Sequence, residues 1–185
     1  MSAEALNTYL DAVGILGCNV NPYLPSLDDI GCTWADAVEL IDRKALFYSK
    51  CYRNRTVYLS REVYGLLKAC LPRRPMPEAA ALLYALLEQA PGLESGELRQ
   101  RSLLGQTDFV KALDFLLAER YATALANGTW LNPNWSTFRY GTAEAWEQGS
   151  GVSPVAVPDP AGRLRTILSR SLPQEEIDQL LRSVH

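Results

Sequence analysis

Apolar residues recur at helical spacing along much of the chain. Near the N-terminus one helical face is formed by Leu6, Tyr9, Leu10, Val13 and Leu16. This spacing predicts an amphipathic helix over residues 5–16. Residues 19–31 hold prolines and paired aspartates and indicate a loop. Thr33 stands three residues before Asp36, so each side chain can cap an N–H at the start of a second helix that runs to about Phe47.

A short hairpin is predicted next. Residues 48–52 and 56–59 are rich in aromatic and β-branched residues and flank the polar tip Arg53-Asn54-Arg55. Ser60 can then cap a helix through Leu71, which Pro72 stops.

Three further helical patterns and a second hairpin follow between residues 79 and 131. The first helix ends at Pro91-Gly92, and Ser95 and Thr107 are expected to cap the second and the third. The pattern changes to strand at Tyr121, and Asn127-Gly128 predicts a two-residue turn, because both residues of that turn need positive φ. Helix, turn, helix, turn, longer helix and hairpin is the order of a winged helix.

The expected fold is therefore α+β and mostly helical, a winged helix-turn-helix with N-terminal and C-terminal helical extensions. Residues 1–75 form an N-terminal helical region with a short basic hairpin, and residues 76–148 form the winged-helix domain. Residues 149–160, rich in Gly, Ser and Pro, form a linker. Residues 161–185 form two helices, each too short to be stable alone in water, which must dock on the body or on a partner. No internal repeat is visible.

Charge is distributed in blocks, although the formal net charge is only −3. Residues 1–42 hold seven acids and no Lys or Arg, whereas residues 43–74 hold nine basic residues against the single acid Glu62. Such asymmetry can create a local positive field that contacts phosphates. The alternative is that the two blocks pack side by side and neutralise each other.

Several classes of chemistry have no support in the sequence. Four widely spaced cysteines form no C-x-x-C pair, and the single histidine is the last residue, His185, where an organised base or metal ligand is not expected. We therefore expect no metal and no cofactor. The N-terminus has no signal-peptide pattern, and no stretch approaches the roughly 18 apolar residues of a membrane span. A cytoplasmic protein with reduced cysteines is expected.

The positions proposed for nucleic-acid contact are basic residues of the hairpin, the winged helix and their neighbours: Lys50, Arg53, Arg55, Arg61, Arg99, Arg101, Lys111 and Arg139. The outward positions of the third helix are less favourable, since Asp108, Asp114 and Glu119 outnumber Lys111 and Arg120. Contact with the phosphate backbone is therefore expected rather than reading of base edges.

Three segments carry a family resemblance. They are residues 34–52 with the TVYLSREVY run after them, residues 97–120, and TWLNPNWSTFRYGTAEAWE at 129–147. Together they resemble the AlkZ-related winged-helix proteins, small relatives of the AlkZ/YcaQ DNA glycosylase family. The resemblance implies a winged-helix fold and a link to DNA damage. Those glycosylases are much longer and position water with a Gln-x-Gln or Gln-x-Asp motif, which only Gln106 and Asp108 match here.

Three functions are consistent with these patterns. The favoured one is a non-enzymatic protein that binds double-stranded DNA weakly through its basic segment, as a monomer or a homodimer. A base-excision enzyme acting on alkylated DNA would use Gln106 and Asp108, with Trp130, Trp135, Phe138 and Tyr140 as stacking faces. Helix capping is the stronger interpretation of Gln106-Thr107-Asp108. The third function is an interaction or ligand-binding scaffold without nucleic acid.

Overall fold

The computed structural model describes residues 1–182, so His185 lies outside the described residues. The described chain is a mixed α+β fold, as predicted. A first region contains α1 (Ala3–Val13), β1 (Ile15–Gly17), the 3-10 helix η1 (Asp28–Ile30), α2 (Trp34–Asp42), β2 (Leu46–Tyr52), β3 (Arg55–Ser60) and α3 (Arg61–Cys70). A second contains α4 (Glu78–Gln89), β4 (Leu93–Glu94), α5 (Ser95–Ser102), α6 (Gln106–Ala118), β5 (Ala122–Asn132), β6 (Trp135–Thr142) and α7 (Ala143–Ser150). Two helices follow, α8 (Pro160–Leu168) and α9 (Gln174–Arg182).

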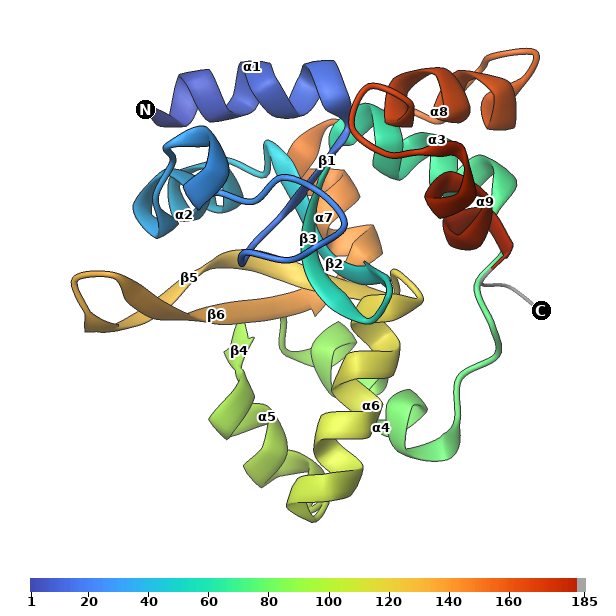
Figure 1. The fold of residues 1–185 in the computed structure, drawn as a ribbon. Coiled ribbons are helices and arrows are strands. Elements are labelled where there is room, and N and C mark those ends of the chain that lie inside the picture. The colour runs from blue at the N-terminus through green and yellow to red at the C-terminus, as the bar shows by residue number, and fades with distance from the viewer. Residues whose placement is uncertain (183–185) are drawn as a thin grey trace.

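The two regions repeat one order of elements. Each has a helix, a short strand, a helix that leads into a hairpin, and a closing helix. Each forms a three-stranded antiparallel sheet in which the second hairpin strand is central, with orders β1-β3-β2 and β4-β6-β5. Figure 1 shows the first region above the long β5–β6 hairpin and helices α4 to α6 below it. The structure thus contains a repeat of topology where the sequence shows none.

The strand β1 was not predicted. The apolar spacing predicted a helix to Leu16, but α1 ends at Val13. Gly14 adopts φ 84°, and its N–H bonds the Leu10 carbonyl and closes the helix. A side chain at Gly14 would collide with Val63 and Ile167. The next three residues pair with β3, and Leu16 therefore points into the core from a strand.

The predicted turn at Asn127-Gly128 is wrong, whereas the first hairpin is confirmed. Arg53 and Asn54 have φ of 51° and 53°, as a two-residue turn requires. Asn127 instead lies inside β5 opposite Phe138, and a register irregularity follows it. Beyond Gly128 the strand continues, and there the Thr129 hydroxyl donates a hydrogen bond to the Glu94 carboxylate. The hairpin therefore continues to Pro133 and projects from the body.

The first sheet is covered on both faces. Along β2, Leu46 and Tyr48 face the core shared with α1, α2, α4 and α6, whereas Phe47 faces a second core formed with α3, α7, α8 and α9. This alternation follows the two-residue period of a strand. In the second core, the buried Trp146 of α7 packs against Phe47 with ring centroids 5.0 Å apart and donates to the Leu46 carbonyl at 3.1 Å.

Helix caps agree with the sequence in part. Thr33 and Asp36 form the predicted capping box, and Ser60 accepts from the Val63 amide. The predictions for Ser95 and Thr107 are wrong: α5 begins at Ser95 itself, and α6 begins after Gly105, which offers no side-chain cap.

The C-terminal helices dock on the body, as their length required. Leu164, Ile167 and Leu168 of α8 and Ile177 and Leu180 of α9 are buried in the second core. Their apolar faces are therefore occupied within the chain. None of the helices in residues 1–182 has the length and apolarity needed to cross a membrane.

Candidate anion-binding cleft

Each region places the helix before its hairpin against the hairpin of the other region. Helix α2 packs on β5, and α6 packs on β2. Three hydrogen bonds join β2 to the second region near this contact. The Ser49 hydroxyl donates to the Leu117 carbonyl at 2.9 Å, and the Thr123 hydroxyl of β5 accepts from the Tyr48 N–H at 3.0 Å and donates to the Tyr48 carbonyl at 2.8 Å. A cleft lies beside each of the two contacts.

The cleft beside α6 and β2, the basic cleft, has a cavity of about 440 Å³. Its charged lining residues are Lys50, Arg53, Arg74, Lys111, Arg120, Asp114 and Glu119. The five cations come from β2, the tip of the first hairpin, the segment after α3, α6 and the turn after α6. Since the acids are two, the cleft keeps an excess of positive charge.

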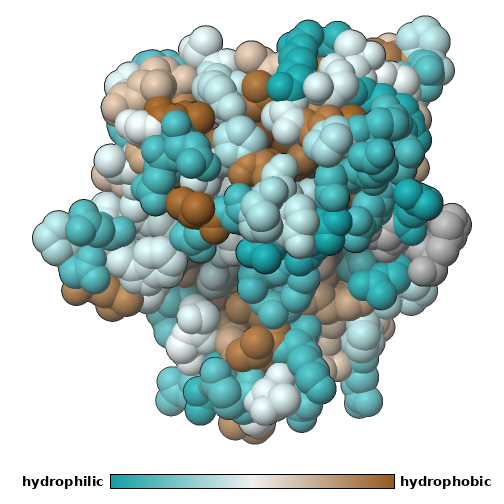
Figure 2. All heavy atoms as spheres, in the orientation of Figure 1, coloured by the Kyte–Doolittle hydropathy of each residue, from teal (hydrophilic) through white to brown (hydrophobic). Residues whose placement is uncertain are grey.

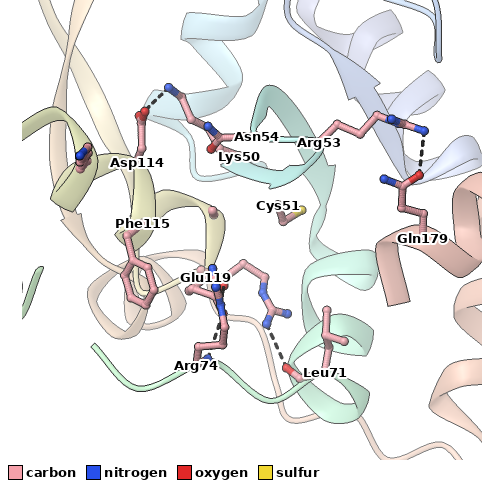
Figure 3. A pocket seen from close by; sticks show the side chains of 13 residues that line it. Lys50, Cys51, Arg53, Asn54, Leu71, Arg74, Asp114, Phe115, Glu119 and Gln179 are labelled. Atoms are coloured by element: carbon pink, nitrogen blue, oxygen red, sulfur yellow. Dashed lines mark hydrogen bonds and ion pairs between the residues drawn. The ribbon is translucent and has the colours of Figure 1, made fainter. Parts of the chain in front are cut away.

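Ion pairs hold most of these cations in place. Lys50 Nζ lies 2.6 Å from Asp114 Oδ1, and Arg74 Nε lies 2.6 Å from Glu119 Oε1. Arg53 donates to both carboxylate oxygens of Glu176 at 2.8 and 2.7 Å. Figure 3 shows the Lys50–Asp114 and Arg74–Glu119 pairs on opposite sides of Cys51. Lys111 is exposed on α6 and forms no ion pair with any residue between 1 and 182.

Arg120 is the most unusual side chain of the basic cleft. It is 4 % exposed, and its guanidinium Nη2 donates to the Leu71 carbonyl at 2.9 Å. Its Nε and Nη1 have no acceptor among the described residues. Burial lowers the pKa of Arg120, because the surrounding protein solvates its charge less well than water does.

Two neighbouring groups titrate outside their usual ranges. Burial raises the pKa of the Cys51 thiol, so Cys51 is neutral near pH 7 and supplies no counter-charge to Arg120. The hydrogen bonds from Arg53, with one from Tyr52, lower the pKa of Glu176 to about 2. Glu176 therefore remains ionised and keeps Arg53 anchored to α9.

The cleft beside α2 and the β5–β6 hairpin, the aromatic cleft, has a different lining. The Trp34 ring stacks between Trp135 and Phe138, with centroids 4.2 and 5.1 Å away, and Trp34 Nε1 donates to Ser136 Oγ at 2.8 Å. Two adjoining cavities of about 390 and 230 Å³ open on this stack. Tyr140 lines the smaller cavity.

The basic residues proposed from sequence do not form one surface. Lys50, Arg53 and Lys111 meet in the basic cleft. Arg55 lies 5.4 Å from the Tyr23 ring centroid, and Arg61 donates to the Lys44 carbonyl at 2.9 Å.

The remaining three proposed residues belong to the second region. Arg99 on α5 donates to the Gln106 side chain, and Arg101 is exposed on the same helix. Arg139 on β6 donates to the Gly92 carbonyl at 3.2 Å. These three residues, two on α5 and one on β6, line neither the basic cleft nor the aromatic cleft.

The basic block is neutralised mainly by acids that follow it in the chain. Within residues 1–182, Arg43 is the one member that pairs with upstream acids, Glu4 and Glu39. The other pairs are Lys50–Asp114, Arg53–Glu176, Lys68–Glu147, Arg73–Glu144 and Arg74–Glu119. The acidic N-terminal block therefore leaves most of the arginines and lysines uncovered, and the second region and α9 supply their partners.

The candidate catalytic pair does not face the aromatic rings. Gln106 and Asp108 are exposed in the first turn of α6, and neither lines the basic or the aromatic cleft. Trp135, Phe138 and Tyr140 line the aromatic cleft. Trp130 is 45 % exposed on the projecting hairpin.

Sequence reasoning missed Arg74 and Arg120 as cleft residues. Arg74 follows the end of α3 in an irregular segment, where no periodicity assigns a direction. Arg120 was counted as an outward position of the third helix, but the helix ends at Ala118. With φ at 62°, Arg120 leaves the helical register, and its side chain turns inward.

Comparisons with known proteins identify no relative: no family model matches the chain, and no curated protein or solved structure is significantly similar to it. Residues 1–182 contain no group of three His, Cys, Asp or Glu side chains able to hold a metal ion. The functional argument therefore depends on the geometry of the clefts.

Proposed function

We propose that the protein is a non-enzymatic binding protein that holds the phosphate backbone of double-stranded DNA weakly in its basic cleft. The observation that carries the proposal is the convergence of Lys50, Arg53, Arg74 and Lys111 on one cavity. Lysine and arginine side chains that meet at one site commonly bind phosphates. Such contacts do not distinguish one DNA sequence from another.

We further propose that both regions are winged-helix units. The support is the shared order of helix, strand, helix and hairpin, with α2 and α6 in the place of the helix that precedes the wing. In the first unit η1 and its flanking loop stand where a middle helix would be. Since α2 packs on β5 and α6 on β2, each of these helices has part of its surface covered by the other unit. This arrangement favours backbone contact over insertion into the major groove.

The existing ion pairs do not prevent phosphate binding. The side chains of Lys50 and Asp114 are 24 % and 28 % exposed, and that of Arg74 is 53 % exposed. Solvent-accessible pairs of this kind contribute only about 0–1 kcal/mol. A phosphate can therefore bind beside Lys50 and Arg74 while their carboxylates stay in place, and Lys111 is exposed with no ion pair to any residue between 1 and 182.

Salt dependence of DNA binding tests the proposal. A duplex with 5′-hydroxyl ends should bind with a log–log salt slope of roughly −3 to −4, corresponding to about four phosphate contacts. Lys111→Gln should reduce the magnitude of the slope by about 1. Fluorescence anisotropy over a salt series would measure both values.

The matched control is Arg163→Gln, which removes the same charge from α8, where Arg163 pairs with the exposed Glu62. This variant should keep the slope of the unmodified protein. Absence of binding at low salt would refute the proposal, as would equal slopes for the Lys111 and Arg163 variants.

A second candidate function is self-association through the end of the β5–β6 hairpin. Trp130, Leu131 and Trp135 are 45 %, 61 % and 45 % exposed there, and Figure 2 shows hydrophobic atoms at the end of this projection. Clustered exposed apolar groups often mark an interface. We propose a second copy of the chain as the partner. Light scattering should show a dimer that Leu131→Ser dissociates, and a concentration-independent monomer would refute this candidate.

A further inference from the structure

Arg120 occupies a backbone conformation that is unfavourable for its residue type. After α6 the Tyr121 N–H bonds the Leu116 carbonyl at 2.9 Å, which closes the helix with Arg120 in the left-handed position that glycine usually fills. The result is a long cationic side chain that begins at a helix end and turns into the interior, where it is 4 % exposed.

The guanidinium has more donors than the protein satisfies. Of the five N–H hydrogens of an arginine, three belong to Nε and Nη1. These two atoms have no acceptor among the described residues, and Nη2 donates to a neutral group, the Leu71 carbonyl. Figure 3 shows this contact as the dashed line that ends at Leu71.

The nearest carboxylate is committed elsewhere. Glu119 precedes Arg120 in the chain, but its two oxygens accept from the side chain and the backbone N–H of Arg74 at 2.6 and 2.9 Å. Glu119 favours the charged form of Arg120 electrostatically, but among residues 1–182 no hydrogen bond joins their side chains. A buried guanidinium without a bonded carboxylate is unfavourable, and an anion bound beside it would supply the missing acceptors. Arg73 adds a further positive charge near Arg120.

Arg120 lines two cavities that could admit an anion. It lines the basic cleft together with Lys111, and it also lines a smaller cavity of about 210 Å³ together with Lys68 and Arg73. Leu71, whose carbonyl accepts from Arg120, also lines both cavities.

We propose that Arg120 is the receptor for a terminal phosphate, the phosphomonoester at the end of a nucleic-acid strand or of a nucleotide. A terminal phosphate has three free oxygens and can enter a buried site. An internal phosphodiester, which is flanked by a sugar on each side, stays at the rim with Lys50, Arg53, Arg74 and Lys111. The choice of a phosphate rather than another anion rests on the proposed function of the same cleft.

Inorganic phosphate is the first probe. It should raise the melting temperature of the full chain above that in chloride of equal ionic strength, and isothermal titration should give an affinity that Arg120→Gln reduces at least tenfold. Arg163→Gln should retain both effects. Without phosphate, Arg120→Gln should melt at or above the temperature of the unmodified protein, because the variant removes a buried guanidinium that has no bonded carboxylate.

The second probe compares strand ends. A short duplex with 5′-phosphates should bind about tenfold more tightly than the same duplex with 5′-hydroxyls, and Arg120→Gln should abolish that difference. If Arg120→Gln fails to fold, Arg120→Lys replaces it and should retain weakened phosphate binding. Phosphate stabilisation that persists in a folded Arg120→Gln, or none in the unmodified protein, overturns the inference.

The proposed backbone binding and the proposed role of Arg120 can be refuted independently of each other. Salt-dependent binding of the 5′-hydroxyl duplex without any effect of phosphate would retain the proposed function and refute the role of Arg120. Phosphate binding that depends on Arg120, without binding of the 5′-hydroxyl duplex, would support the receptor and refute backbone binding.

Discussion

In the first region the helix before the hairpin begins with Thr33 and Trp34, whereas in the second it begins with Gly105 and Gln106. Both helices pack against the other region's hairpin. Trp34 contacts the hairpin of the second region through stacked rings, while Gln106 is exposed and accepts a hydrogen bond from Arg99. The same topology therefore places stacked rings beside the first contact and charged side chains beside the second, which also buries apolar residues of α6 and β2.

The two clefts therefore have different roles, one in stability and the other in binding. Stacked rings bury apolar area and hold the two regions together. Charged pairs at the rim of the basic cleft contribute little to stability but can exchange partners. We conclude that the aromatic cleft fixes the arrangement of the regions, and that the basic cleft is the part of the molecule suited to an anionic ligand.

The largest expected effect is the loss of the aromatic contact. Trp34→Ala removes the stack on Trp135 and Phe138 and the bond to Ser136, so we expect the free energy of unfolding to fall by about 3 kcal/mol. The corresponding change in the second region, Gln106→Ala, should cost less than about 0.5 kcal/mol. Urea unfolding measures both. Equal losses would show that the two contacts do not differ as described.

A smaller effect is expected at the hydroxyl that joins the second region to β2. Thr123→Val leaves the backbone N–H and carbonyl of Tyr48 without this partner in a buried place, which should cost about 2 kcal/mol. The control is Thr129→Val, where the hydroxyl bonds Glu94 at the surface and the expected loss is below about 0.5 kcal/mol. If the Thr123→Val protein is as stable as the control, the hydrogen bonds between Thr123 and Tyr48 do not contribute to stability as proposed.

The pairing of Arg53 with α9 should be sensitive to pH. The folded-state pKa of Glu176 is about 2, below the unfolded value of about 4.3, so the pair stabilises the fold fully above pH 4.3 and loses this effect as the pH falls toward 2. Glu176→Gln should therefore cost about 1 kcal/mol at pH 7, and the difference from the unmodified protein should shrink below pH 4.

Glu175→Gln is the matched control for this pH dependence, since Glu175 is exposed in the same turn of α9. Thermal unfolding between pH 7 and pH 2 should show a pH-independent difference for this variant. A parallel, pH-independent loss for Glu176→Gln would mean that the carboxylate charge does not matter.

The smallest effect concerns the helix starts. Gly105 has φ −64° and no atom lies within 4 Å of the place where its Cβ would stand, so a serine fits there. Gly105→Ser should stabilise the protein by a few tenths of a kcal/mol, about 0.3, by giving α6 a cap of the kind that Thr33 gives α2. If urea unfolding shows that the variant is more stable, a side-chain cap stabilises α6 as it does α2. If the variant is less stable, the turn before α6 requires glycine.

Local patterns determined much of the fold. The capping box at Thr33 and Asp36, the serine cap at Ser60 and the turn at Arg53 and Asn54 depend on neighbours in the chain, and each formed where its residues predicted. The same is true of the amphipathic helices, because their apolar faces need only some core to pack against. The charge asymmetry of the first 74 residues was also visible directly.

The tertiary structure decided what depends on distant partners. The three residues after Gly14 form a strand because they pair with β3. The second hairpin extends past Asn127-Gly128, where the Thr129 hydroxyl bonds the distant Glu94 carboxylate. Apart from Glu4 and Glu39, which pair with Arg43, the ion-pair partners given above for the basic block lie between residues 114 and 176, which no local pattern places beside it. Above all, the inward turn of Arg120 follows from a helix end and from the packing of α6 on β2, so its buried charge could be recognised only in the folded chain.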